Sequence, residues 1–147
     1  SLSSERIAGD ILAKSGAHDC HLYQASKETL FAQSDLAISA TGTLTLSLAA
    51  WRLPTLILAK VSYPTYLILK YVIRFKLSFF GLPNILSGKQ VFPELIQLFT
   101  PKEIEEQLWN LSHDGLTSEN KDNLNTMLKT LKVDSDPYAS IAKGLIS

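Results

Sequence analysis

Apolar and polar positions alternate along the chain with spacings that predict helices and strands in turn. Helical spacing predicts helices over residues 5–15, from Ser26 to Phe31 and from Thr43 to Leu53. Short apolar runs predict strands at 20–23, 36–39 and 55–59. Strands that alternate with helices indicate an α/β fold with a Rossmann-like parallel sheet and helices on both faces.

The second half of the chain is predicted to be mostly helical. Helices are expected over 64–75, 93–98, 100–111, 123–131 and 138–146, with an irregular loop over 82–90 and a polar linker over 112–119. Thr100-Pro-Lys-Glu103 is a capping box with proline at the first helical position. We therefore predict a Rossmann-like domain over 1–111, incomplete at its N-terminal side, followed by a linker and C-terminal helices over 112–147.

The turn Thr41-Gly42-Thr43 follows the predicted strand 36–39 and precedes a predicted helix. Open parallel sheets bind ligands at the carboxyl ends of their strands, and a glycine there lets a ligand approach the backbone closely. A single glycine in a strand-to-helix turn is more often structural, and the turn matches neither a full dinucleotide fingerprint nor a phosphate loop. The loop Leu82–Gln90 is a second candidate, because long loops over a parallel sheet often hold ligands.

Charge adds a second feature to this pattern. The chain has 14 Lys+Arg and 14 Asp+Glu among 147 residues, but between Asp35 and Glu94 there are six bases and no acid. Because the chain as a whole is neutral, nucleic acid is not an expected partner. The acid-free stretch is also the most apolar part of the chain, which points to an anionic ligand or a membrane surface.

Bases and aromatic residues share the predicted helix 64–75, a composition that suits the interface of an anionic membrane. The expected membrane-facing bases are Lys60, Lys70, Arg74 and Lys76. A half-buried helix with solvated lysines explains the same pattern. No uncharged run in this stretch reaches the roughly 20 residues that a spanning helix needs.

The chain offers little for metal or disulfide chemistry. Its three histidines are scattered and lack obvious partner ligands, and Cys20 is its single cysteine. The N-terminus has no apolar run typical of a signal peptide. We expect no metal, no cofactor and a reducing cytoplasmic setting.

Several segments together resemble one family in order and spacing. They are Ser34–Thr43, Trp51–Pro54, Tyr63–Tyr66, Leu82–Lys89 and Pro93–Leu95. They resemble the C-terminal half of lipid-A-disaccharide synthase, most densely between Leu82 and Gln97. The resemblance implies an inverting glycosyltransferase of the two-Rossmann-domain type that binds its nucleotide-sugar donor mainly through its C-terminal domain.

The resemblance also implies the substrates and the setting. The family transfers 2,3-diacylglucosamine from its UDP derivative to 2,3-diacylglucosamine 1-phosphate and forms the β-1,6-linked disaccharide of lipid A. Both substrates are acylated, so a peripheral position on the cytoplasmic face of the bacterial inner membrane is expected.

The family's donor-binding residues carry over to positions in this sequence. Thr41, Gly42 and Thr43 match its Ser-Gly-Thr turn, Asn84 its Leu-Pro-Asn segment, Gly88 and Lys89 its Gly-Arg, and Glu94 a glutamate that follows. Ser47 stands where the family has a glutamate of the kind that grips ribose hydroxyls. A serine offers no bidentate, charge-assisted grip, so the ribose contact is expected to be weaker.

No residue is nominated as catalytic, because the general base of the family is expected in an N-terminal domain outside this sequence. The chain is expected to bind donor without completing catalysis. Two alternatives stay open: a transferase of another UDP-amino sugar with a lipid acceptor, and a non-enzymatic membrane-docking module. The apolar stripe of the predicted C-terminal helices makes a homo-oligomer a further possibility.

Overall fold

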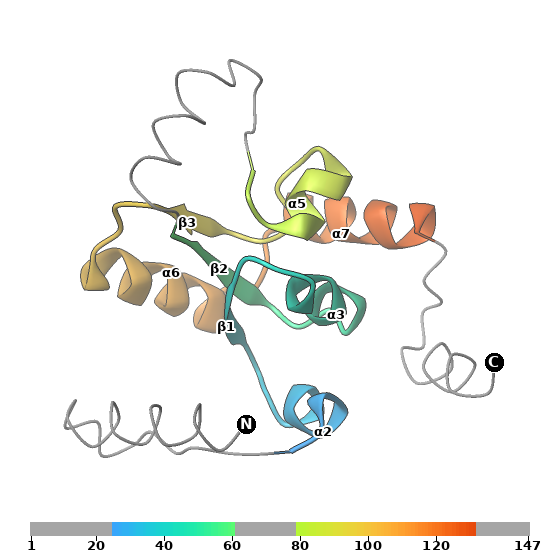
Figure 1. Ribbon diagram of the computed structural model, residues 1–147, viewed down its shortest axis with the longest axis horizontal. Helices are drawn as coiled ribbons and strands as arrows, with labels where there is room; N and C mark the ends of the chain where they lie inside the picture. The colour runs from blue at the N-terminus through green and yellow to red at the C-terminus, as the bar shows by residue number, and fades with distance from the viewer. Residues whose placement is uncertain (1–24, 61–78, 132–147) are drawn as a thin grey trace. The chain divides into compact units, whose positions relative to one another are not determined.

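The computed structural model describes residues 25–60 and 79–131. The chain divides into two compact units, residues 1–33 and 34–147. In the first unit the described helix is α2 (Lys27–Ala32), shown in Figure 1. Its N-cap Ser26 accepts the Thr29 N–H through its side chain. This confirms the helix predicted to open at Ser26. The elements predicted at 5–15, 20–23, 64–75 and 138–146 lie outside the described residues.

The second unit contains a three-stranded parallel sheet in the order β1-β2-β3. The strands are β1 (Ala37–Ala40), β2 (Thr55–Ala59) and β3 (Glu94–Ile96). Ala37 lies opposite Thr55, and Ile57 lies opposite Glu94. The central strand β2 is the most buried of the three, as expected of a β-branched and leucine-rich run covered on both faces. The strands predicted at 36–39 and 55–59 are thereby confirmed, the first with a shift of one residue.

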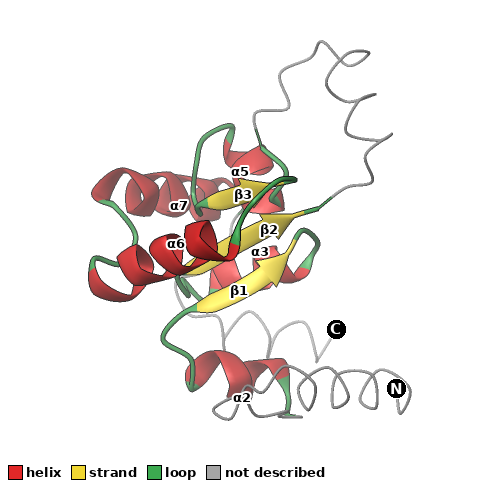
Figure 2. Cartoon of the chain, turned by 90° about the vertical axis from the view of Figure 1, so that its left-hand side faces the viewer, coloured by secondary structure: helices red, strands yellow, loops and turns green. Residues whose placement is uncertain are grey.

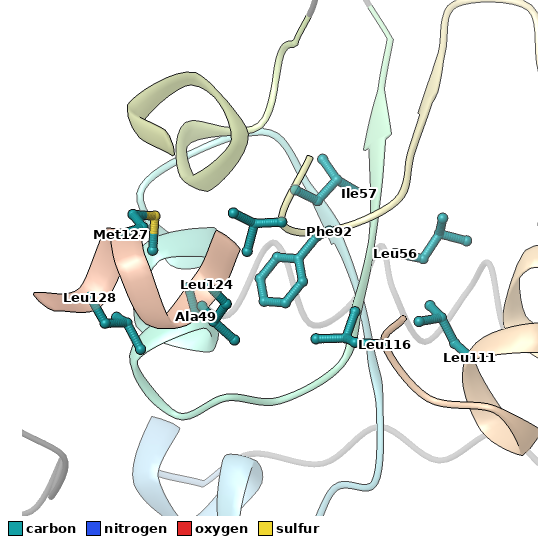
Figure 3. Packing of buried hydrophobic residues seen from close by; sticks show 10 residues of the cluster. Ala49, Leu56, Ile57, Phe92, Leu111, Leu116, Leu124, Met127 and Leu128 are labelled. Atoms are coloured by element: carbon teal, nitrogen blue, oxygen red, sulfur yellow. The ribbon is translucent and has the colours of Figure 1, made fainter. Parts of the chain in front are cut away.

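Helices cover both faces of this sheet. They are α3 (Leu44–Ala50), α5 (Leu82–Ser87), α6 (Pro101–His113) and α7 (Ser118–Thr130). Figure 2 shows α6 on one face of the sheet and α3 on the other. Successive side chains of a strand point to opposite faces, and Figure 3 accordingly shows Leu56 on the same side as Leu111 of α6, with Ile57 on the side of α3, α5 and α7. The predicted Rossmann-like α/β fold is confirmed for the described residues.

The core on the α7 side is built around Phe92, which is fully buried just before β3. Leu124 and Met127 of α7 and Ala49 of α3 belong to the same buried cluster (Figure 3). Burying a side chain of this size contributes roughly 1.5–3 kcal/mol. In this cluster α7 packs beside α5, Phe92 and Ala49, so the apolar positions of the helix predicted over 123–131 form the buried face of α7.

The helix termini follow the local sequence signals. The Thr100 side chain accepts the Glu103 N–H, and the Glu103 carboxylate accepts the Thr100 N–H at 2.7 Å, which completes the predicted capping box. The helix it opens runs two residues beyond the predicted Leu111. Thr117 caps α7 by accepting the Asn120 N–H. The predicted linker 112–119 is therefore shorter in the structure, since α7 begins at Ser118.

Two predictions between 82 and 98 are wrong. The stretch 82–90 is not an irregular loop throughout, because Leu82–Ser87 form α5, with Gly81 as its N-cap and Gly88 as a left-handed C-cap. Pro83 falls in the first turn, where its missing N–H costs nothing. The stretch 93–98 is not a helix, because Glu94–Ile96 pair with β2 as β3. Pairing with the sheet decides the structure of this short apolar run.

Candidate functional site

The turn Thr41–Thr43 lies at the carboxyl end of β1 and leads into α3. The buried Thr45 side chain donates to the Gly42 carbonyl at 2.6 Å and fixes the turn from inside. Gly42 has φ +152°, and a Cβ placed there would meet no atom within 4 Å. Thr43 is exposed and its side chain makes no capping hydrogen bond. The turn therefore presents open backbone and an uncommitted hydroxyl at the sheet edge where such folds bind ligands.

Ser47 lies in α3 one helical turn after Thr43. Residues four apart share a helix face, so Ser47 faces the same side of α3 as the turn. Its side chain is half-buried. The structure thus brings Thr41, Gly42, Thr43 and Ser47 together, as the sequence predicts. Their contacts with a donor stay a prediction.

Asn84 lies in α5 with its side chain fully buried. Its Oδ1 accepts the backbone N–H groups of Val91 at 2.7 Å and Phe92 at 2.9 Å. Its Nδ2 donates to the Phe92 carbonyl at 2.8 Å, and the side chain also hydrogen bonds Glu94. These bonds use the full capacity of a carboxamide. The geometry supports a structural role for Asn84, whereas its predicted contact with the donor stays a prediction.

Glu94 begins β3 and holds the backbone that enters α5. One carboxylate oxygen accepts the Gly81 N–H at 2.8 Å, and the Phe80 N–H lies 3.1 Å and 3.2 Å from the two oxygens. Burial raises the pKa of Glu94 above its ordinary value, while the hydrogen bonds from Gly81, Phe80 and Asn84 oppose that rise. We call the side chains of Asn84 and Glu94, with the backbone groups they bind, the Asn84–Glu94 network. It ties α5 to the start of β3.

Gly88 and Lys89 are placed apart from the turn. Gly88 ends α5 in the left-handed conformation with φ +66°, and both residues are exposed. They precede β3, whereas Thr41–Thr43 follow β1. Because the strands are parallel, one segment lies at the amino ends of the strands and the other at their carboxyl ends. A role of Gly88 and Lys89 in donor binding stays a prediction.

Of the four bases predicted to face a membrane, the structure describes Lys60. It is exposed and directly follows β2 at the carboxyl edge. Lys70, Arg74 and Lys76 lie outside the described residues. Over 25–60 and 79–131, none of the helices combines the length and the apolar character needed to traverse a bilayer.

The described residues 25–60 and 79–131 contain no cluster of metal-ligating side chains. Within those two ranges, no three histidine, cysteine or carboxylate side chains gather as they would around a metal ion. The histidine with described surroundings, His113, bonds the Ser112 side chain and the Trp109 carbonyl instead.

The backbone conformation of Gln97, at the carboxyl end of β3, could not be predicted from the sequence. It directly follows β3, has φ +64°, and is the centre of a tight turn in which the Leu98 N–H donates to the Ile96 carbonyl at 2.9 Å. Its own N–H donates to the Ala59 carbonyl at the end of β2. Glutamine has no preference for this backbone region, so no local signal could have found it.

A parallel α/β sheet with an open glycine turn at its carboxyl edge places the described part of the chain among Rossmann-like domains. The family model described as lipid-A-disaccharide synthetase matches residues 2–141. The chain therefore belongs to the lipid-A-disaccharide synthetase family, which confirms the resemblance.

Relatives named lipid-A-disaccharide synthase match parts of the chain. The protein from Chromobacterium violaceum is 41% identical over 83 residues, or 56% of this chain and 21% of the relative. The one from Xylella fastidiosa is 39% identical over 77 residues, 52% of this chain and 20% of the relative. The one from Pseudomonas paraeruginosa is 34% identical over 119 residues, 80% of this chain and 30% of the relative. No solved structure matches the chain.

Proposed function

We propose that this chain is the donor-binding part of a glycosyltransferase, a lipid-A-disaccharide synthase. The match of the family model across residues 2–141 carries the proposal. The matched segments span only 20% to 30% of the length of the relatives described above. The enzymatic activity that the names of these full-length relatives state is therefore proposed, too, for the protein to which this chain belongs.

The proposed donor is UDP-2,3-diacylglucosamine and the proposed acceptor is 2,3-diacylglucosamine 1-phosphate. The turn Thr41–Thr43 binds the diphosphate, since its backbone is open at Gly42 and the Thr43 hydroxyl has no partner in capping α3. Ser47 lies on the same face and accepts one ribose hydroxyl in place of the family's glutamate. The hydrogen bonds of the Asn84–Glu94 network support a role in holding α5 in place, and a direct contact of Asn84 or Glu94 with the donor stays a prediction.

The proposed setting is the cytoplasmic face of a bacterial inner membrane, where both acylated substrates reside. Lys60 supports it as an exposed base at the carboxyl edge, and the sequence places Lys70, Arg74 and Lys76 in the same acid-free stretch. Each base near an anionic surface contributes about 1 kcal/mol. Salt-sensitive binding to phosphatidylglycerol vesicles, weakened when all four bases are changed to glutamine, tests this position.

Calorimetric titration of the chain with UDP, UMP and uridine tests the donor site. A site for the diphosphate binds UDP more tightly than UMP, and UMP more tightly than uridine. Thr43→Val removes the free hydroxyl without changing side-chain volume much, and should weaken UDP binding several-fold while leaving uridine binding nearly unchanged. Thr126→Val makes the same chemical change on the exposed side of α7 and serves as the control.

Two results would contradict the donor site. Absence of UDP binding would show that these residues form no site in this chain. Equal affinity for UDP and uridine would show that the turn does not bind the diphosphate.

A further inference from the structure

A cavity of about 390 Å³ lies beside the start of β2. It is at the opposite end of the parallel strands from the turn Thr41–Thr43, which follows the end of β1. Its floor is apolar and consists of Pro54, which precedes β2, with Leu116 and Leu124. Both leucines are part of the buried cluster and lie on the same side of the sheet (Figure 3). The volume falls within the range of small-molecule sites.

The rim of this cavity is cationic. Arg52 and Lys121 line it, and none of the described carboxylates does. The Arg52 guanidinium donates to the Asn125 Oδ1 atom, a neutral acceptor that leaves the charge uncompensated. Within the part of the chain that the structure describes, neither base forms an ion pair. Two uncompensated cations over an apolar floor are complementary to an anion that carries an apolar group.

The backbone of Arg52 departs from local preference. It follows α3 in a Schellman arrangement, in which the Arg52 N–H donates to the Ala49 carbonyl and the Leu53 N–H to the Leu48 carbonyl. Arg52 has φ +56°, at the position where helices commonly end with glycine. Residues held in disfavoured backbone regions concentrate at functional sites. An arginine at this position supplies a cation to the rim that a glycine could not.

We propose that this cavity binds an amphipathic anion. A phosphate or carboxylate head lies between Arg52 and Lys121, and a short apolar chain packs on Leu116, Leu124 and Pro54. Because the cavity adjoins the start of β2, it is separate from the proposed donor site at the end of β1. The ligand is either a free amphiphile or the headgroup region of a membrane lipid, since both have this chemistry.

Titration with octyl phosphate, kept below its micelle concentration, tests the proposal. Arg52→Gly removes the cation and suits the left-handed backbone, so the variant should fold at least as well. Lys121→Gln removes the other cation from an exposed helical position. Each change should weaken octyl phosphate binding about tenfold or more. Lys129→Gln on the same helix lies outside the cavity and should leave binding unchanged.

Titrations with three further ligands test the cationic and the apolar part of the cavity separately and identify the source of the ligand. Inorganic phosphate and 1-octanol should each bind at least tenfold more weakly than octyl phosphate, because each lacks one half of the ligand. Vesicles that contain phosphatidylglycerol identify the source: a loss of vesicle binding in Arg52→Gly and Lys121→Gln assigns a lipid headgroup, and a loss confined to octyl phosphate assigns a free amphiphile. UDP binding should be retained in both variants.

The proposal is overturned if both variants bind octyl phosphate and vesicles as the unaltered chain does. It is also overturned if inorganic phosphate or 1-octanol binds as tightly as octyl phosphate, because one half of the cavity would then have no role. Loss of UDP binding in the same variants would mean that the cavity and the donor site are not separate.

Discussion

The turn Thr41–Thr43 and the Asn84–Glu94 network both match motifs of the same family, yet they differ in how the fold uses them. In the turn, Gly42 faces open space and the Thr43 side chain caps nothing. In the network, the Asn84 side chain is fully buried and bonded on both of its polar atoms. One motif leaves polar groups available to a ligand, and the other uses its polar groups within the protein.

The comparison shows that a polar residue in a family motif can serve either the fold or the binding of a ligand. A buried amide without partners is costly, so a fold that buries Asn84 must satisfy it internally. An exposed hydroxyl such as that of Thr43 has no such requirement and can exchange water for a ligand. Substitutions in the network should therefore destabilise the fold, whereas substitutions in the turn should change binding with little effect on folding.

The largest effect on folding is expected from Asn84→Ala. The change removes the partners of the Val91 N–H, the Phe92 N–H and the Phe92 carbonyl in a buried position. Since an unsatisfied buried group costs about 1–3 kcal/mol, the free energy of unfolding should fall by about 3 kcal/mol or more. Urea denaturation followed by circular dichroism measures this.

The control is Asn110→Ala on the exposed side of α6, which should change stability by no more than about 0.5 kcal/mol. A loss below about 1 kcal/mol for Asn84→Ala would remove the distinction between network and turn. In that case a direct contact with donor would again be the better account of Asn84.

Gly81→Ala should have the next largest effect. A Cβ at Gly81 would lie 2.4 Å from the Ile57 Cδ1 atom and 3.2 Å from the Glu94 Oε2 atom. Ile57 is fully buried, so the crowding should cost about 1–3 kcal/mol. Thermal and urea unfolding of the variant measure the loss.

A second substitution makes the cause of this loss explicit. Ile57→Val removes the crowded Cδ1 atom, so the double variant Gly81→Ala with Ile57→Val should be more stable than the sum of the single changes predicts. Gly88→Ala offers a contrast, because its cost comes from the left-handed backbone with open space around it. Ile57→Val should not rescue it. Strict additivity in the first pair would rule out the contact with Ile57 as the cause.

A smaller effect should distinguish Glu94 from Glu103 by its dependence on pH. Burial raises the pKa of Glu94 in the folded protein, so its contribution to stability is most favourable below the unfolded value of about 4.3 and is lost as pH rises through the folded value. Hydrogen bonds from Thr100 lower the pKa of Glu103. Its contribution is therefore present above that unfolded value and lost as pH falls through the folded value.

Unfolding free energies measured from about pH 3 to about pH 8 for Glu94→Gln and Glu103→Gln, relative to the unaltered chain, test these signs. With rising pH the unaltered chain should lose stability relative to Glu94→Gln and gain it relative to Glu103→Gln. Parallel profiles for the two variants would show that the buried network and the exposed cap have the same electrostatic environment.

Local signals were sufficient for part of the fold. The capping box at Thr100 predicts the start of α6, and the run Thr55–Ala59 predicts β2 with its bounds. Both depend on residues close in sequence. In contrast, α5 and β3 depend on distant partners: Glu94 holds the backbone of Gly81, and β3 exists by pairing with β2. Short segments of this kind carry too little local preference to decide their own structure.

The candidate site, too, could be predicted only in part from local sequence. The position of Thr41–Thr43 at the end of β1 follows from the order of strand and helix, so it could be predicted. The burial of Asn84 could not, because its partners at Val91 and Phe92 are reached only after α5 folds back onto the start of β3. A motif shared with a family identifies positions of importance, but burial and hydrogen bonding decide whether a position binds a ligand or maintains the fold.

The smallest effect on folding is expected from Ser47→Glu, which introduces on α3 the residue type that the resemblance to the family implies for this position. Glutamate is at least as good a helix former as serine, so stability should change by no more than about 0.5 kcal/mol. A carboxylate that accepts two ribose hydroxyls forms charge-assisted hydrogen bonds, and UDP affinity should rise about tenfold. Ser47→Gln has similar length without the charge and should give little gain. If calorimetry finds the same UDP affinity for Ser47→Glu and Ser47→Gln, the ribose does not lie beside α3, and the turn and Ser47 do not form one site.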